Sequence, residues 1–277
     1  GTDIKSSSID KNTYFGSYCQ GGGNTAAYVA DTAPVISAVK SAVGSGDATY
    51  YRSIAILLVN TDEQAGSTGY PFRDFKSGWP NGYASFAIAV LAANSTGTNG
   101  LVKHEAGGHG FGKLADEYIY HNAFIQSCDC TCCEHLQELL GGKNLGWYRN
   151  LEITGDVQEV GWSHLIFHPQ YSNVVDVYEG GYFHSRGVYR SEPTSCMNNN
   201  IPYYNAISRE AMVKRIMKYA GEEYSFEEFK ANDKEALPSV VTKSDWMWSE
   251  GTGASSRFDQ MPPKFMGEKP SFNKNAF

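Results

Sequence analysis

The chain has no long hydrophobic run and no surplus of positive charge. Its most apolar stretches, Ile54–Val59 and Phe86–Ala93, are far shorter than the ~20 residues that cross a bilayer as a helix. The net charge of −7 argues against a nucleic-acid partner, because phosphate binding needs a basic face. A phosphate loop, a nucleophile elbow, a dinucleotide fingerprint and internal repeats are also missing. What remains is a chain of 277 residues, 41% apolar, which suffices for a globular core.

The organisation of the chain follows from its composition. We expect a single domain over residues 1–277, with a loop-rich start over residues 1–30 and an irregular tail over residues 237–277. The polar opening and the scarcity of strong strands before residue 100 suggest that an N-terminal portion is missing. The even number of cysteines favours a secreted or extracytoplasmic protein. The missing N-terminal portion would anchor such a protein to a surface.

Hydrophobic patterning predicts a mixed α/β chain of short elements. The apolar run over residues 53–60 predicts a buried central strand, and residues 84–91 predict a second strand. Residues 61–83, rich in Gly, Ser and Pro, are expected to form a loop. The expected helices are one capped by Asp31 and running through 34–40, one over 134–140 ended by Gly141-Gly142, an amphipathic one over 208–219, and one begun by the capping box Ser225–Glu228.

The segment His104-Glu105-Ala106-Gly107-Gly108-His109 carries the strongest chemical signal. It nearly matches H-E-x-x-H, in which two histidines four residues apart share one helix face and bind zinc. Here the second histidine is five residues on, and a regular α-helix would point the two rings about 140° apart. A π-turn at Ala106–Gly108 would realign them, and two adjacent glycines ease such a distortion. We therefore expect helix over Leu101–Tyr118, with His104 and His109 as metal ligands.

A third ligand is expected shortly after the helix. Gly112 stands three residues after His109, where metzincins place a glycine that lets the chain turn back towards the metal. The usual ligand position falls on Ala115, which cannot bind metal, so Asp116 is the best candidate. Glu117 and His121 are the alternatives.

Residues His104 to Tyr118, read as H-E-A-G-G-H-G-F-G-K-L-A-D-E-Y, resemble the signature of the bacterial IgA-specific metallo-endopeptidase family. The departure is one inserted glycine. The resemblance extends through Gly180–Arg190 and Ser195–Asn199. It implies a metzincin-like zincin fold, α/β (α+β), with a mixed twisted sheet, an active-site helix and a downstream Met-turn at Met197. It also implies one catalytic Zn²⁺ held by His104, His109 and Asp116.

The function implied by this resemblance is hydrolysis of peptide bonds in an extracellular protein. Zinc would activate a water, with Glu105 as general base. Tyr189, His184 and Tyr203 are candidates for stabilising the oxyanion or contacting substrate, and the sequence does not choose among them. The expected partner is a protein or peptide substrate.

Two alternatives keep the zinc motif in a different role. A zincin scaffold that binds without catalysis is one, and a zinc amidase acting on cell-wall peptides is another. A third interpretation is a structural module organised by Cys128, Cys130, Cys132 and Cys133, with His135 close behind. This cluster predicts disulfides, a second, structural metal or free buried thiols, and its spacing differs from the C-x-x-C pairs of zinc ribbons.

Overall fold

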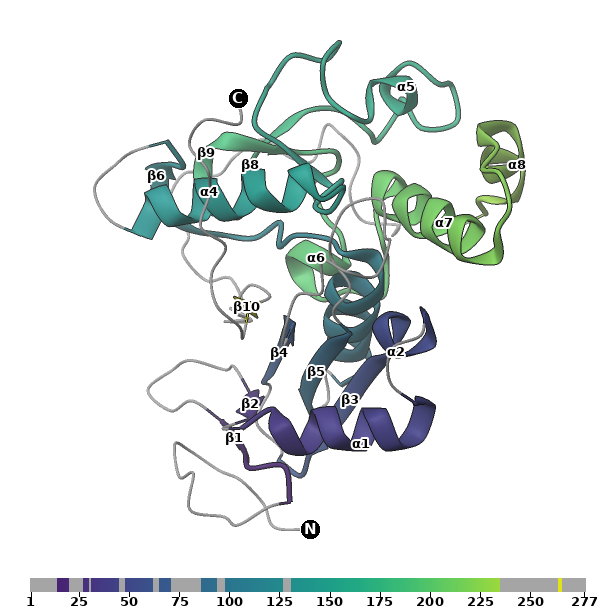
Figure 1. The fold of residues 1–277 in the computed structure, drawn as a ribbon. Helices are drawn as coiled ribbons and strands as arrows, with labels where there is room; N and C mark the ends of the chain where they lie inside the picture. The colour runs from purple at the N-terminus through teal and green to yellow at the C-terminus, as the bar shows by residue number, and fades with distance from the viewer. Residues whose placement is uncertain are drawn as a thin grey trace, which may run out of the picture. The chain divides into compact units, whose positions relative to one another are not determined.

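A computed structural model of the chain describes residues 14–19, 27–29, 31–44, 48–61, 65–70, 86–93, 98–126, 131–234 and 264–265. Over these ranges the protein is mixed α/β, with eight α-helices, one π-helix and ten strands in three small sheets (Figure 1). It divides into two compact units, residues 1–96 with 259–277 and residues 97–258. None of the described helices combines the length and apolarity that crossing a membrane requires.

The first unit is built on a four-stranded sheet. Its strand order is β10 (Lys264–Phe265), β4 (Gly66–Tyr70), β5 (Ala87–Ala92) and β3 (Ile54–Val59). β5 runs parallel to β3 and antiparallel to β4. The remaining elements of this unit are the antiparallel pair β1 (Ser17–Cys19) and β2 (Ala27–Val29), and the helices α1 (Ala33–Val43) and α2 (Ala48–Arg52).

Two expectations for this unit are wrong. β3 is the outermost described strand of its sheet instead of a central one, and Ile56 and Leu58 on it are 48% and 64% exposed. The expected loop over residues 61–83 contains β4, whose five residues are all buried. Its sequence, GSTGY, has no apolar alternation, so hydrophobic periodicity could not reveal it. The N-cap residue of α1 is Thr32, without a side-chain cap bond, and Asp31, one residue before it, accepts a hydrogen bond from the Ala33 amide at 2.9 Å.

The second unit surrounds strand β9 (Phe183–Arg190). β9 pairs in parallel with β6 (Ile119–Phe124) and antiparallel with both β7 (Leu151–Glu152) and β8 (Tyr178–Gly181). The helices are α3 (Thr98–Leu101), the π-helix η1 (Val102–Gly112), α4 (Thr131–Asn144), α5 (Ser163–Ile166), α6 (Cys196–Asn199), α7 (Ala206–Ala220) and α8 (Phe226–Asn232). α4 packs against β9 through His135 and Phe183, whose ring centroids are 5.1 Å apart (Figure 1).

Two helices of this unit begin with a side-chain cap, and one helix ends at a different residue from the one expected. Asn205 caps α7 by accepting from the Ser208 amide, and Ser225 caps α8 by accepting from the Glu228 amide. α4, however, does not end at Gly141-Gly142 but continues to Asn144. A Cβ added at Gly142 would overlap the ring of Tyr148, so this glycine serves close packing and not helix termination.

Candidate metal centre

The His-Glu motif lies on a π-helix. η1 covers Val102–Gly112, so the expected π-turn exists and extends well beyond Ala106–Gly108. Hydrogen bonds from residue i to i+5 widen each turn, which brings side chains five residues apart onto one face. His104 and His109 therefore point to the same place. The expectation that the helix reaches Tyr118 is wrong, because η1 ends at Gly112 and residues 113–118 have no regular secondary structure.

Three buried side chains meet at one point. His104 Nε2 lies 3.1 Å from His109 Nε2 and 2.9 Å from Asp116 Oδ1, and His109 Nε2 lies 3.2 Å from the same oxygen. The three residues are at most 1% exposed. Two ligands of a tetrahedral zinc ion with bonds of 2.0–2.1 Å stand about 3.3 Å apart. His104, His109 and Asp116 thus form a group that could hold a metal ion, as expected.

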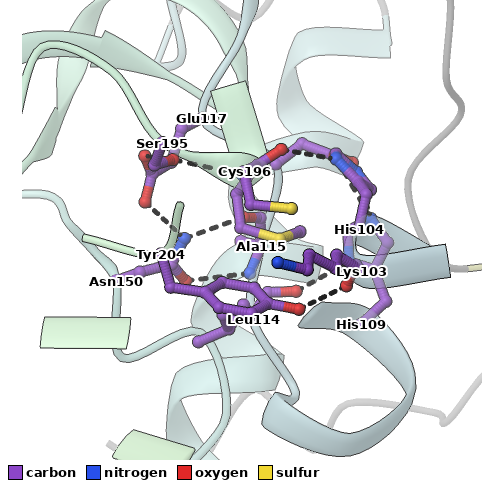
Figure 2. A network of polar contacts seen from close by, with 12 residues as sticks. Lys103, His104, His109, Leu114, Ala115, Glu117, Asn150, Ser195, Cys196 and Tyr204 are labelled. Atoms are coloured by element: carbon purple, nitrogen blue, oxygen red, sulfur yellow. Dashed lines mark hydrogen bonds and ion pairs between the residues drawn. The ribbon is translucent and has the colours of Figure 1, made fainter. Parts of the chain in front are cut away.

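Backbone carbonyls orient both imidazoles. His104 Nδ1 donates to the carbonyl of Cys196 at 2.9 Å, and His109 Nδ1 donates to that of Leu114 at 2.8 Å (Figure 2). A carbonyl only accepts, so Nδ1 carries the proton in each ring and Nε2 faces the common point. Such outer hydrogen bonds fix the tautomer of metal-binding histidines. The third residue adds to this picture, because the other carboxylate oxygen of Asp116, Oδ2, is buried without a hydrogen-bond partner among the described residues.

The electrostatics of the group favour positive charge at its centre. Burial by itself lowers the pKa of His109, but the charge and hydrogen bond of Asp116, with the charge of Glu105, raise it to about 9. Burial raises the pKa of Asp116, and the two histidines outweigh this and hold it below its ordinary value. Without metal, a proton on His109 therefore neutralises the carboxylate. A metal ion would replace that proton.

The chain leaves η1 through Lys113 and not through Gly112. Lys113 adopts the left-handed conformation, with φ of 55°, and its amide donates to the carbonyl of Gly108. Its own carbonyl accepts from the Tyr148 amide at 2.8 Å. Gly112 is needed for another reason, since a Cβ there would lie 2.9 Å from Met212 Cε. The interpretation of Gly112 as the turning residue is therefore wrong by one position.

A buried amide holds the segment that delivers Asp116. Asn150 accepts from the Ala115 amide at 2.9 Å and donates to the Ala115 carbonyl at 2.8 Å (Figure 2). On the other side, the Asp116 carbonyl accepts from the Tyr182 amide at 3.0 Å. Two separate elements therefore fix the backbone on both sides of the carboxylate.

Glu117 connects this segment to α6. Its carboxylate accepts from Asn150 Nδ2 and Asn205 Nδ2 at 2.8 Å each and from Ser195 Oγ at 2.5 Å. Its amide donates to the Met197 carbonyl at 2.8 Å. Glu117 was the alternative third ligand, but these bonds direct it towards α6 and α7, away from the histidines. It positions Asp116 instead.

The glycine pair of the motif makes room for two side chains from the α6 region. A Cβ added at Gly108 would overlap Sδ of Met197, and one at Gly107 would overlap the hydroxyl of Tyr204. That hydroxyl donates to the carbonyl of Lys103 (Figure 2). Met197 is fully buried and packs against the π-helix at Gly108, and its role as a Met-turn residue stays a prediction. Tyr204 and Asn150 carry no motif and were missed in the sequence.

The other predicted residues lie elsewhere. The Tyr203 hydroxyl donates to Glu192 at 2.7 Å, and Tyr189 pairs with Glu179 of β8. His184, with Nε2 3.0 Å from His135 Nδ1, belongs to a cluster that also includes His121. These partners of Tyr203, Tyr189, His184 and His121 lie outside the group formed by His104, His109 and Asp116. The ring of Tyr118, by contrast, stacks on His104 with centroids 6.4 Å apart.

The predicted cysteine cluster lies largely outside the described residues. Cys128 and Cys130 fall in the undescribed range 127–130, and α4 includes Cys132 and Cys133 only as backbone. Cys196 is described, and it is a buried free thiol. The choice between disulfides and a second metal at Cys128–Cys133 therefore stays a prediction.

Two comparisons with known proteins, by family model and by curated sequence, found no match. The inference of function therefore rests on the metal group itself and on the motif around it.

Proposed function

We propose that this chain is a zinc-dependent endopeptidase that cleaves an extracellular protein or peptide. The observation that carries the proposal is the buried convergence of His104, His109 and Asp116, with Glu105 on the same helix. Two imidazoles and one carboxylate are the ligand type of catalytic zinc sites, which keep a further position open. The resemblance of residues 104–118 to the IgA-specific metallo-endopeptidase signature supports the same activity and a metzincin-like fold.

Zinc is the metal that suits this donor set best. Mg²⁺ and Ca²⁺ prefer shells of oxygen atoms, whereas two imidazole nitrogens favour zinc and its transition-metal neighbours. When bound, zinc would polarise a water molecule and the scissile carbonyl. The carbonyls of Cys196 and Leu114 keep both rings aimed at the ion, so the site needs little rearrangement to bind it.

Glu105 is the group that moves the proton. It follows His104 directly on η1 and is fully buried, and its charge contributes to the raised pKa of His109. A carboxylate beside the metal would accept a proton from the water and return it to the leaving amine nitrogen. Tyr118, stacked on His104, is a candidate hydroxyl-bearing ring for the oxyanion role. We also propose that the protein is exported from the cytoplasm and so would meet an extracellular substrate.

Glu105→Gln tests the assignment directly. We expect hydrolysis of a fluorogenic peptide library to fall about 10²–10⁴-fold, while bound zinc is unchanged. Glu223→Gln, at an exposed position, is the matched control and should leave the rate as it is. A wild-type chain that binds zinc but cleaves no peptide, with chelator-treated protein as the blank, would instead indicate a binding protein on this scaffold.

A further inference from the structure

Histidines outside the metal group gather at a second place. The chain has seven histidines, and His121, His135 and His184 form this cluster. They come from three separate elements, β6, α4 and β9, and in the β6/β9 ladder His121 and His184 are paired in register. The proposed peptidase mechanism uses none of the three.

The ring nitrogens of His135 and His184 are already about as far apart as two ligands of one metal ion. His135 Nδ1 lies 3.0 Å from His184 Nε2, within a few tenths of an ångström of the about 3.3 Å between two nitrogens on a tetrahedral zinc. One of the two nitrogens must carry a proton that it donates to the other. A metal ion between them would displace that proton, as it would at His109.

The surroundings keep the imidazoles uncharged, which metal binding requires. Burial, followed by the neighbouring rings of His135 and His121, lowers the pKa of His184 to about 4. Burial and His121 also lower the pKa of His135, and these effects outweigh the opposing charge of Glu134. At neutral pH the rings of His135 and His184 therefore offer lone pairs and do not repel a cation.

From this juxtaposition we propose that His121, His135 and His184 form a second metal site, which takes a divalent transition ion, with zinc as the first choice. Three imidazoles and no oxygen ligand favour zinc, copper or nickel over magnesium and calcium. The ion would link β6, α4 and β9. This proposal does not depend on the peptidase activity.

His121 must move to complete the site. Its ring centroid is 5.7 Å from that of His184 and 6.5 Å from that of His135. Among the described residues, only the His104 group has all three ligand atoms within 4.8 Å of one another. His121 is exposed on β6, so its side chain can rotate towards the pair without disturbing the core.

Metal counting on the full chain separates the two sites. The protein is loaded with ZnCl₂, freed of excess by gel filtration, and its zinc is measured by mass spectrometry. We expect about two equivalents in the wild type, and about one in each of His104→Ala and His135→Ala. His121→Ala should lower affinity for the second equivalent about tenfold or more, and His168→Ala is the control that keeps both. If His135→Ala still binds the zinc ion assigned to His104, His109 and Asp116, the unit of residues 97–258 is still folded.

Each other outcome points to one proposal. A single equivalent that is lost with His104→Ala and kept with His135→Ala overturns the second site and leaves the peptidase site intact. A single equivalent lost only with His135→Ala supports the second site and contradicts the first. A second equivalent that survives His121→Ala and His135→Ala but is lost in Cys132→Ser with Cys133→Ser also overturns the proposal, because thiolates would then hold the ion.

Discussion

The Nε2 atoms of His104 and His109 lie 3.1 Å apart, although the residues are five positions apart in the chain. In a regular α-helix this spacing would direct the rings about 140° away from each other. In the π-helix η1, side chains five residues apart lie on one face, so the two rings point to the same place. The glycines at 107 and 108 let this helix lie against Tyr204 and Met197. The inserted residue and the unusual helix therefore compensate for each other.

Gly108 and Met197 should be energetically coupled. In Gly108→Ala the new methyl group overlaps Met197 Sδ, so we expect about 1–3 kcal/mol of destabilisation together with weaker zinc binding. Met197→Ala alone should cost about 2–5 kcal/mol through the cavity it leaves. The double variant should be less destabilised than the sum, because the shorter side chain makes room for the methyl group. Denaturant unfolding of the metal-free proteins measures this, and strict additivity would count against the packing described.

Asp116→Asn should nearly abolish zinc binding at the first site. The substitution keeps the volume but removes the negative charge that both histidines face. Loss of an outer hydrogen-bond partner typically costs 10–100-fold in metal affinity, so loss of a ligand should cost more than about 100-fold. Chelator competition gives the affinity, with the exposed Asp156→Asn as control. If Asp116→Asn binds zinc as tightly as the wild type does, Asp116 is not a ligand.

Glu117→Gln should weaken the hydrogen bonds that position Asp116 and leave the three proposed ligand side chains unchanged. Asn150, Asn205 and Ser195 all donate to this carboxylate, and an amide would turn an N–H group towards at least one of these donors. We expect a loss of about 1–3 kcal/mol in unfolding free energy and about tenfold weaker zinc binding. Ser195→Ala removes only one donor and should cost less. Equal stability of Glu117→Gln and wild type would show that the network does not support the fold.

Zinc affinity at the first site should rise with pH. The raised pKa of His109, about 9, means that zinc must displace a proton at neutral pH. Apparent affinity should therefore increase by about tenfold per pH unit up to about pH 9 and then level off. Titration calorimetry in buffers of different ionisation enthalpy, on His135→Ala protein, counts the released proton. A flat profile between pH 7 and 9 would contradict the assigned protonation.

The stability of the metal-free protein should change with pH in the opposite direction to zinc affinity. A histidine with a raised pKa stabilises the fold fully below its unfolded value of 6.5, and this stabilisation is lost as the pH rises through 9. Unfolding free energy of the metal-free chain should thus fall between pH 6.5 and 9. Urea titrations across this range measure it, and His109→Gln should remove that part of the slope.

Local chemistry could be predicted from the sequence, and long-range contacts could not. The spacing of His104 and His109 required a π-distortion, and the capping role of Ser225 followed from side-chain chemistry. β4 was missed because its small residues are buried without an apolar pattern. Asn150 was missed because its importance comes from contacts with Ala115, 35 residues away in the chain, and no local spacing reveals such a contact.

The arrangement of two histidines and an aspartate around one zinc ion is tested most directly by anomalous diffraction. Crystals of the full chain grown with zinc, measured above and below the zinc absorption edge, should show a peak about 2.0–2.1 Å from Nε2 of His104, Nε2 of His109 and a carboxylate oxygen of Asp116. The helix at residues 104–109 should be π in the same map. A regular α-helix there, with the two rings apart and no anomalous peak between them, would contradict the account.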